Sequence, residues 1–141
     1  MLVRLVYASR ACKPISPALI DAILTTARCH NPANGITGVL CHGDDMFVQA
    51  LEGGRDQVNR LYLRLLQDKR HKDVTLLCYQ EIGVRQYASW TMGKAGLDKL
   101  NRSLLLKYSS TGMFNPYDVS GCATVALLEE LATAGAFAVR D

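Results

Sequence analysis

The stretch Asn34-Gly-Ile-Thr-Gly-Val-Leu-Cys-His-Gly-Asp-Asp-Met-Phe-Val-Gln-Ala-Leu-Glu-Gly-Gly54 predicts a β-hairpin, and the rest of the fold is arranged around it. Its two runs of strand-forming residues are Ile36–Cys41 and Met46–Leu51, and the Gly-Asp-Asp between them has the composition of a hairpin turn. The glycine pair that closes the stretch is expected to end the second strand, because glycine weakens a strand interior. The middle of the chain is therefore predicted to form two neighbouring strands.

Before the hairpin, the sequence predicts one strand and one helix. Residues Val3–Ala8 alternate between two faces, which is the period of a strand. Ser16-Pro17 has the pattern of a helix N-cap followed by proline in the first turn. Apolar residues then recur at helical spacing, and the helix is expected to end near His30, because Pro32 disfavours helical geometry in the residue before it.

After the hairpin, the same reasoning predicts a second helix and two further strands. The strands are expected at Val74–Ile82 and, more briefly, at Ser89–Lys94. The order βαββαββ suits an α+β, ferredoxin-like fold, in which a five-stranded sheet carries both helices on one face. The apolar face of the second helix consists of Val58, Leu61, Tyr62, Leu65 and Leu66.

The last third of the chain has a different pattern and predicts a helical cap. Asp98–Lys107 suits a short helix, and Ala123–Ala138 suits an apolar, alanine-rich helix. Two helices on one side of the sheet would leave its other face bare, so the second of these segments is expected to cover that face. Its apolar surface consists of Leu127, Leu128 and Leu131, extended by Phe137 and Val139.

Composition and charge narrow the classes of function. A length of 141 residues suits one core, and 49% hydrophobic with 21% charged residues is an ordinary globular balance. The net charge of +3 is spread along the chain, whereas a nucleic-acid binder usually gathers its basic residues on one stripe. The basic run Lys69–Lys72 is interpreted as a solvated helix end. Without a membrane-length apolar run or a secretion signal, we expect a cytoplasmic protein with no membrane or nucleic-acid partner.

The cysteines and histidines predict no metal site. The five cysteines are odd in number and lack a C-x-x-C pair, which argues against a disulfide framework and against zinc. The three histidines show no ligand spacing. We therefore expect free cysteines that mostly serve as small core residues.

Three polar residues stand out on pattern alone. Tyr7 lies on the apolar face of the first strand, Gln49 on the apolar face of the second hairpin strand, and Asn31 closes the first helix. A buried glutamine must find partners or cost about 1–3 kcal/mol, so Gln49 is the strongest hint of a ligand site. Each also has a plain structural interpretation, as a core tyrosine, a structural amide and a helix cap.

Several short motifs together resemble BLUF domains, the blue-light sensors that use FAD. Each motif is weak alone, whereas the ordered set in one small chain is specific, and it spans about Leu2 to Gly93. On this resemblance we divide the chain into a flavin-binding domain at 1–95 and a C-terminal helical extension or cap at 96–141. The motifs are Tyr7 near the end of the first strand, His30-Asn31, Asn34–Gly38 (NGITG), Phe47–Gly53 (FVQALEG) and Ser89–Met92 (SWTM).

The resemblance implies that an FAD isoalloxazine ring lies between the two helices. Asn31 matches the asparagine that hydrogen-bonds the polar edge of the ring, and Gln49 matches the glutamine between the ring and Tyr7. Arg64 and Asp68, four apart on the second helix, match positions that border the ribityl and phosphate portion, or else form a surface pair. The residues that match cofactor-binding positions are Tyr7, His30, Asn31, Gln49, Arg64 and Asp68.

The resemblance also implies a photochemical switch rather than catalytic residues. Tyr7 would give an electron and a proton to the excited flavin, and Gln49 would change its hydrogen bonds without changing charge. Trp90 and Met92, two apart on one expected strand and therefore on one face, match residues near the glutamine that shift on illumination. The implied function is a reversible blue-light photoreceptor that biases two protein states.

Two other classes of function are weighed from the residues alone. An enzyme on such a sheet, for example a small phosphatase, needs a phosphate-binding glycine loop or a nucleophile with its base, and neither motif is found. A regulatory module that binds a colourless metabolite is the closer alternative. The 46 residues from Gly96 onward are too few for a cyclase or phosphodiesterase domain, so we expect a separate downstream signalling protein as partner. Small BLUF proteins typically form homo-oligomers, which the resemblance extends to this chain.

Overall fold

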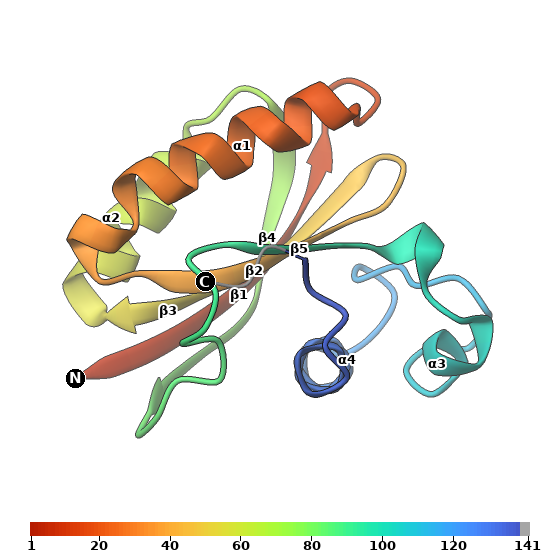
Figure 1. The fold of residues 1–141 in the computed structure, drawn as a ribbon. Helices are drawn as coiled ribbons and strands as arrows, with labels where there is room; N and C mark the ends of the chain where they lie inside the picture. Colours follow the sequence, from red (N-terminus) through yellow and green to blue (C-terminus); the bar gives the residue numbers. More distant parts are fainter. Residues whose placement is uncertain (139–141) are drawn as a thin grey trace.

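The computed structural model describes residues 1–138 as a five-stranded sheet between two layers of helices (Figure 1). The strands lie in the order β4-β1-β3-β2-β5, with β5 parallel to β2 and the other neighbours antiparallel. With α1 and α2 on one face, this order confirms the predicted α+β, ferredoxin-like fold. The elements are β1 (Leu2–Ala11), α1 (Pro17–His30), η1 (Pro32–Asn34), β2 (Thr37–His42), β3 (Met46–Gly54), α2 (Arg55–Leu66), β4 (His71–Ile82), β5 (Gly93–Gly96), η2 (Leu97–Lys99), α3 (Arg102–Leu106) and α4 (Gly121–Thr133).

Local sequence signals explain where the first helix begins and ends. The Ser16 hydroxyl accepts a hydrogen bond from the backbone N–H of Leu19 at 3.1 Å, and Pro17 occupies the first helical position. Asn31 is the C-cap, immediately before Pro32. These contacts confirm the predicted helix and fix the direction in which α1 crosses the sheet.

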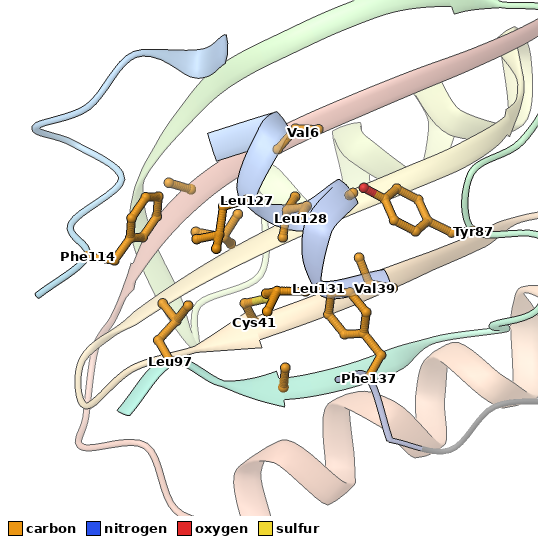
Figure 2. Packing of buried hydrophobic residues seen from close by; sticks show 14 of the residues in the cluster. Val6, Val39, Cys41, Tyr87, Leu97, Phe114, Leu127, Leu128, Leu131 and Phe137 are labelled. Atoms are coloured by element: carbon orange, nitrogen blue, oxygen red, sulfur yellow. The ribbon is translucent and has the colours of Figure 1, made fainter. Parts of the chain in front are cut away.

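The alternating residues of the strands supply two separate cores. On one face, Leu5 and Leu51 pack with residues of α1 and α2. On the other face, Val6, Val39 and their neighbours pack under α4, as Figure 2 shows. The predicted cap over the second face is therefore confirmed, with Leu127, Leu128 and Leu131 as its fully buried leucines.

Several predicted boundaries are wrong. β3 ends at Gly54 rather than at Leu51, because Gly53 and Gly54 still pair with β1. β4 begins three residues earlier than predicted, at His71, and the single helix expected after Asp98 is split between η2 and α3. α4 spans Gly121–Thr133 rather than Ala123–Ala138, because Gly135 adopts a left-handed conformation at φ 72° just beyond it. The apolar contribution expected from Val139 lies outside the described residues.

Among residues 1–138, none of the helices combines the length and the apolar character that a membrane crossing needs.

Candidate functional site

A cavity of about 440 Å³ lies between α1, α2 and the sheet. Its walls are apolar, whereas its floor and its mouth carry polar groups. This combination suits a flat ring with a polar edge and a polar tail. The apolar walls are formed by Ile23, Ala27, Leu40, Phe47, Leu61 and Leu65, and the polar groups by Tyr7, Thr26, His30, Asn31, Asn34, Gln49, Arg64, Asp68, Arg70 and His71.

Tyr7 and Gln49 form a hydrogen-bonded pair on the cavity floor. They are direct cross-strand neighbours of β1 and β3, so both side chains project from the same face of the sheet. The Tyr7 hydroxyl donates to Gln49 Oε1 at 2.5 Å, and both residues are buried. Burial raises the pKa of the Tyr7 phenol far above its usual value, with smaller contributions from Tyr62 and Asp68. Tyr7 therefore keeps its proton and acts as the donor.

The other end of the Gln49 amide contacts Met92. Gln49 Nε2 donates to Met92 Sδ at 3.4 Å, and sulfur is a weak acceptor. Met92 is completely buried in the core on the side of α1 and α2. The amide of Gln49 thus has a strong hydrogen-bond partner in Tyr7 and a weak one in Met92. The bond to Met92 is the more easily broken of the two.

The prediction that Trp90 and Met92 lie on one strand and share a face is wrong. β5 begins only at Gly93, and a turn closed by the hydrogen bond from Trp90 N to Tyr87 O precedes it. Trp90 packs into the core under α4, where its ring lies 5.9 Å from that of Phe137, whereas Met92 packs on the opposite face. The turn breaks the two-residue period, and so the two side chains leave the backbone on opposite sides of the sheet.

Asn31 does more than close α1. Its side-chain Nδ2 donates to the carbonyl of Thr91 at 3.3 Å, which joins the helix end to the segment before β5. Asn31 is buried, while its neighbour His30 is exposed at the cavity rim. Sequence reasoning missed Arg28, whose guanidinium donates to the Met92 carbonyl at 3.1 Å. The end of α1 therefore holds two consecutive backbone carbonyls, those of Thr91 and Met92.

The mouth of the cavity carries positive charge from Arg64 and Arg70. Arg64 is exposed and makes no side-chain hydrogen bond or ion pair within the part of the chain that the structure describes, so its guanidinium is available. Asp68 lies beyond the end of α2 rather than on it, which corrects the prediction, and it pairs with Arg70 instead of Arg64. The hydrogen bond from Arg70 lowers the pKa of the Asp68 carboxyl. Arg70 was missed because it lies in the basic run interpreted as a solvated helix end.

His71 supports the floor of the cavity from the start of β4. Its Nε2 lies 2.5 Å from the carbonyl of Leu65, which can only accept, so Nε2 carries the proton. Its Nδ1 lies 2.8 Å from the Ser9 hydroxyl, with which it shares a hydrogen bond. The ring packs edge-on to Tyr7, with centroids 6.2 Å apart. His71 thus packs against the Tyr7 ring and lines the cavity beside it.

The residues present fit a planar conjugated cofactor with an anionic tail. The apolar walls suit a ring system, the amides of Asn31 and Gln49 suit its polar edge, and Arg64 suits a phosphate at the mouth. Residues 1–138 contain no cluster of three or more His, Cys, Asp or Glu side chains suited to a metal ion. Fold and site together therefore define a protein that binds a planar ring, with hydrogen-bonding side chains at the polar edge of that ring.

Comparison with known proteins agrees with this class. The family model for BLUF domains, sensors of blue light using FAD, matches residues 2–93, and the chain belongs to this family. Over 95 residues it is 44% identical to photoactivated adenylate cyclase subunit beta of Euglena gracilis, an alignment that covers 67% of this chain and 11% of that protein. The chain therefore spans about a tenth of the length of such relatives.

Solved structures of smaller proteins match nearly end to end. BlsA in its photo-activated state has a TM-score of 0.83 and 34% identity, and the match covers 94% of this chain and 95% of that one. BlrB, a BLUF protein in its dark state, has a TM-score of 0.79 and 30% identity, with 94% and 96% covered. The similarity thus extends beyond the family match into the segment that contains α3 and α4.

Proposed function

We propose that this protein is a blue-light photoreceptor that binds FAD non-covalently between α1 and α2 and switches through the chain Tyr7–Gln49–Met92. The observation that carries the proposal is this chain of contacts on the floor of a cavity with apolar walls. It combines the buried phenol of Tyr7, the amide of Gln49, whose oxygen and nitrogen are both hydrogen-bonded, and the weakly bound thioether of Met92. Such an arrangement can change its hydrogen bonds with little cost and no change of charge.

A flavin that carries phosphate, rather than riboflavin, is supported by the mouth of the cavity, and FAD is the flavin that the description of the matching family names. The guanidinium of Arg64 is exposed and has no partner among the described residues, so it can bind a phosphate group through paired donors. Arg70 contributes a second positive charge there, although Asp68 neutralises part of it. We assign Asn31 and Gln49 to the polar edge of the ring, and His30, Arg64 and Asp68 to the rim and tail.

A bound flavin would supply the absorption of blue light and an acceptor for an electron and a proton. Tyr7 holds the matching proton on a phenol that burial keeps from ionising in the dark. Reversal of the Gln49 amide exchanges its donor and acceptor ends, so the cavity floor presents the opposite hydrogen-bond pattern. The bond to Met92 Sδ would then be lost, because an amide oxygen cannot donate to sulfur.

We propose that the output passes to a separate protein and that the chain acts as a sensor without catalysis of its own. In the Euglena relatives the matching segment is part of a much longer photoactivated adenylate cyclase subunit. In this chain the residues after β5 fold back as α3 and α4 onto the sheet, which makes α4 the natural relay. We further propose that the protein works as a homo-oligomer in the cytoplasm.

The proposal is tested by colour, by a light-induced spectral shift and by Gln49→Leu. The protein is expected to purify yellow and to shift its absorption slightly to the red under blue light. Gln49→Leu is expected to keep the flavin and to lose the shift, because leucine cannot donate or accept a hydrogen bond. Gln80→Leu, at an exposed residue of β4 that does not line the cavity, is the matched control and is expected to behave as the wild type.

Two outcomes would contradict the proposal. A correctly folded, colourless protein that takes up no flavin on reconstitution would favour a regulatory module for a colourless metabolite. A normal shift in Gln49→Leu would make Gln49 a structural amide only.

A further inference from the structure

A buried ion pair lies on the sheet face opposite the flavin cavity. Arg4 of β1 and Glu52 of β3 are direct cross-strand neighbours. Arg4 Nε and Nη2 lie 2.8 and 2.7 Å from Glu52 Oε2, and Glu52 has no exposed surface. Burying two charges is costly, and the pair persists only where further hydrogen bonds satisfy both groups. The further hydrogen bonds of Glu52 show which segment of the chain the ion pair holds in place.

The remaining bonds of Glu52 go to the segment that joins β4 to β5. Glu52 Oε2 accepts from the backbone N–H of Gln86 at 3.0 Å, and Oε1 accepts from that of Tyr87 at 2.6 Å. One carboxylate thus binds the guanidinium of Arg4 and two consecutive backbone amides. Segment 83–92 is therefore anchored to the sheet by a side chain and not only by its own turns.

The same segment brings Met92 into contact with Gln49. The turn from Tyr87 O to Trp90 N begins at the residue that Glu52 holds. The carbonyl of Trp90 then accepts from Gly38 N at 2.9 Å, and two residues later Met92 contacts Gln49. The anchor at Tyr87 and the contact of Met92 with Gln49 are therefore joined by five residues of backbone.

Arg4 also faces the cap helix. Arg4 Nη1 lies 4.0 Å from Glu129 Oε1 of α4, and its guanidinium lies 5.7 Å from the centre of the Tyr87 ring. Figure 2 shows the Tyr87 hydroxyl directed toward α4. Arg4 is thus the point where the sheet, the anchored segment and the cap helix meet.

We propose that Glu52 and Arg4 are positioning residues for the light response. Glu52 holds segment 83–92 so that Met92 contacts Gln49, and Arg4 passes a displacement of that segment to Glu129 and α4. In a water-poor site, each bond of such a network depends on the others, so the segment and the ion pair move as a unit. This inference rests on the proposed function and adds the route from Met92 to the cap.

The first test replaces Glu52 by glutamine. An amide has a single acceptor oxygen, so it cannot serve both the Arg4 side and both backbone amides. In the flavin-free protein we expect the Gln86 and Tyr87 amides to exchange hydrogen at least tenfold faster than in the wild type. In the flavin-bound protein we expect the dark return of the spectral shift to change at least threefold. Glu81→Gln removes an exposed carboxylate paired with Arg55 and is the matched control, expected to change neither rate.

The second test separates positioning from transmission. Glu129→Gln is expected to keep the wild-type photocycle, because Glu129 lies on α4, away from Gln49 and Met92, but to abolish the light-dependent exchange of α4. If Glu52→Gln fails to fold, Arg4→Met with Glu52→Met replaces the pair by apolar side chains and still removes the anchor. That double variant is expected to show the same faster exchange of Gln86 and Tyr87.

The outcomes distinguish this inference from the proposed function. A wild type without a spectral shift overturns the proposed function and, with it, the light-response role of the pair. A normal wild-type shift combined with unchanged exchange and unchanged dark return in Glu52→Gln overturns the positioning role alone. A light-dependent change in α4 that survives in Glu129→Gln overturns the transmission through Arg4.

Discussion

The sheet face toward α1 and α2 encloses a cavity of about 440 Å³, whereas the face toward α4 is filled by side chains (Figure 2). Both faces are lined by alternate residues of the same strands, so the strands alone do not explain the difference. On the first face, the two helices stand apart and leave the sheet open between them. On the second, leucines of a single helix lie over the centre of the sheet. The layer above the sheet therefore decides which face can hold a ligand.

The polar groups of the two faces differ in the same way. On the cavity face, Tyr7 donates to Gln49, and the side chains around them keep spare hydrogen-bonding capacity. On the filled face, the Tyr87 hydroxyl has no partner among the described residues, while Glu52 is saturated by four hydrogen bonds and ion-pair contacts. Hydrogen bonds on the cavity face can therefore rearrange, whereas those of Glu52 on the filled face hold its neighbours in place.

Core truncation is expected to give the largest difference between the faces. Leu131→Ala on the filled face should cost about 2–5 kcal/mol, because the fully buried side chain leaves a new cavity. Ile23→Ala on the cavity wall should cost less than half of that in flavin-free protein, because the side chain is only partly buried and already borders open space. Urea unfolding of both flavin-free variants measures the two free energies. Equal costs would show that the cavity collapses without its ligand.

Removal of a charge at the cavity mouth is expected to have the next largest effect. Arg64→Ala should weaken FAD binding about tenfold and leave the affinity for riboflavin, which has no phosphate, unchanged. Titration of the flavin-free protein with each flavin measures both affinities. Arg60→Ala lies one turn earlier on α2 and does not line the cavity, so it serves as the control. Equal losses for FAD and riboflavin would assign Arg64 to folding rather than to phosphate binding.

The two buried tyrosines are expected to give the smallest but most direct contrast. Tyr7→Phe should destabilise the protein by about 1 kcal/mol, because Gln49 Oε1 loses its donor. Tyr87→Phe should be neutral or slightly stabilising, because it removes a buried hydroxyl that has no hydrogen-bond partner among residues 1–138. Thermal or urea unfolding in the dark compares them. A cost for Tyr87→Phe as large as that for Tyr7→Phe would contradict the contrast between the faces.

The residues that sequence reasoning placed correctly are those governed by their nearest neighbours. The alternation in β1 and β3 places Tyr7 and Gln49 on one face, and the two residues prove to be paired. Ser16 and Asn31 bound the first helix through local capping. Short-range periodicity and capping depend on residues within about one helical turn, and a single sequence contains that information.

The misplaced residues depend on contacts made over long distances in the chain. Trp90 and Met92 were expected on one face, but the segment before β5 is bent by its own turn and anchored by Glu52, 34 residues or more away. Asp68 was expected to share a helix face with Arg64, but α2 ends at Leu66 and Arg70 takes its carboxylate. No periodic pattern in the sequence predicts that the carboxylate of Glu52 binds the backbone of a loop more than 30 residues away.

The sequence by itself determined the order of strands and helices, the cap, the family and the polar residues around the cavity floor. These features follow from the spacing of residues and from short motifs, because they depend on residues that are close together in the sequence. Only the tertiary structure decided that Met92 contacts Gln49 while Trp90 packs under α4. It also decided that Glu52 binds segment 83–92 and that Arg4 lies between Glu52 and α4. The physical reason is that a buried carboxylate must have its acceptors filled, and which donors fill them is settled only when distant segments come together.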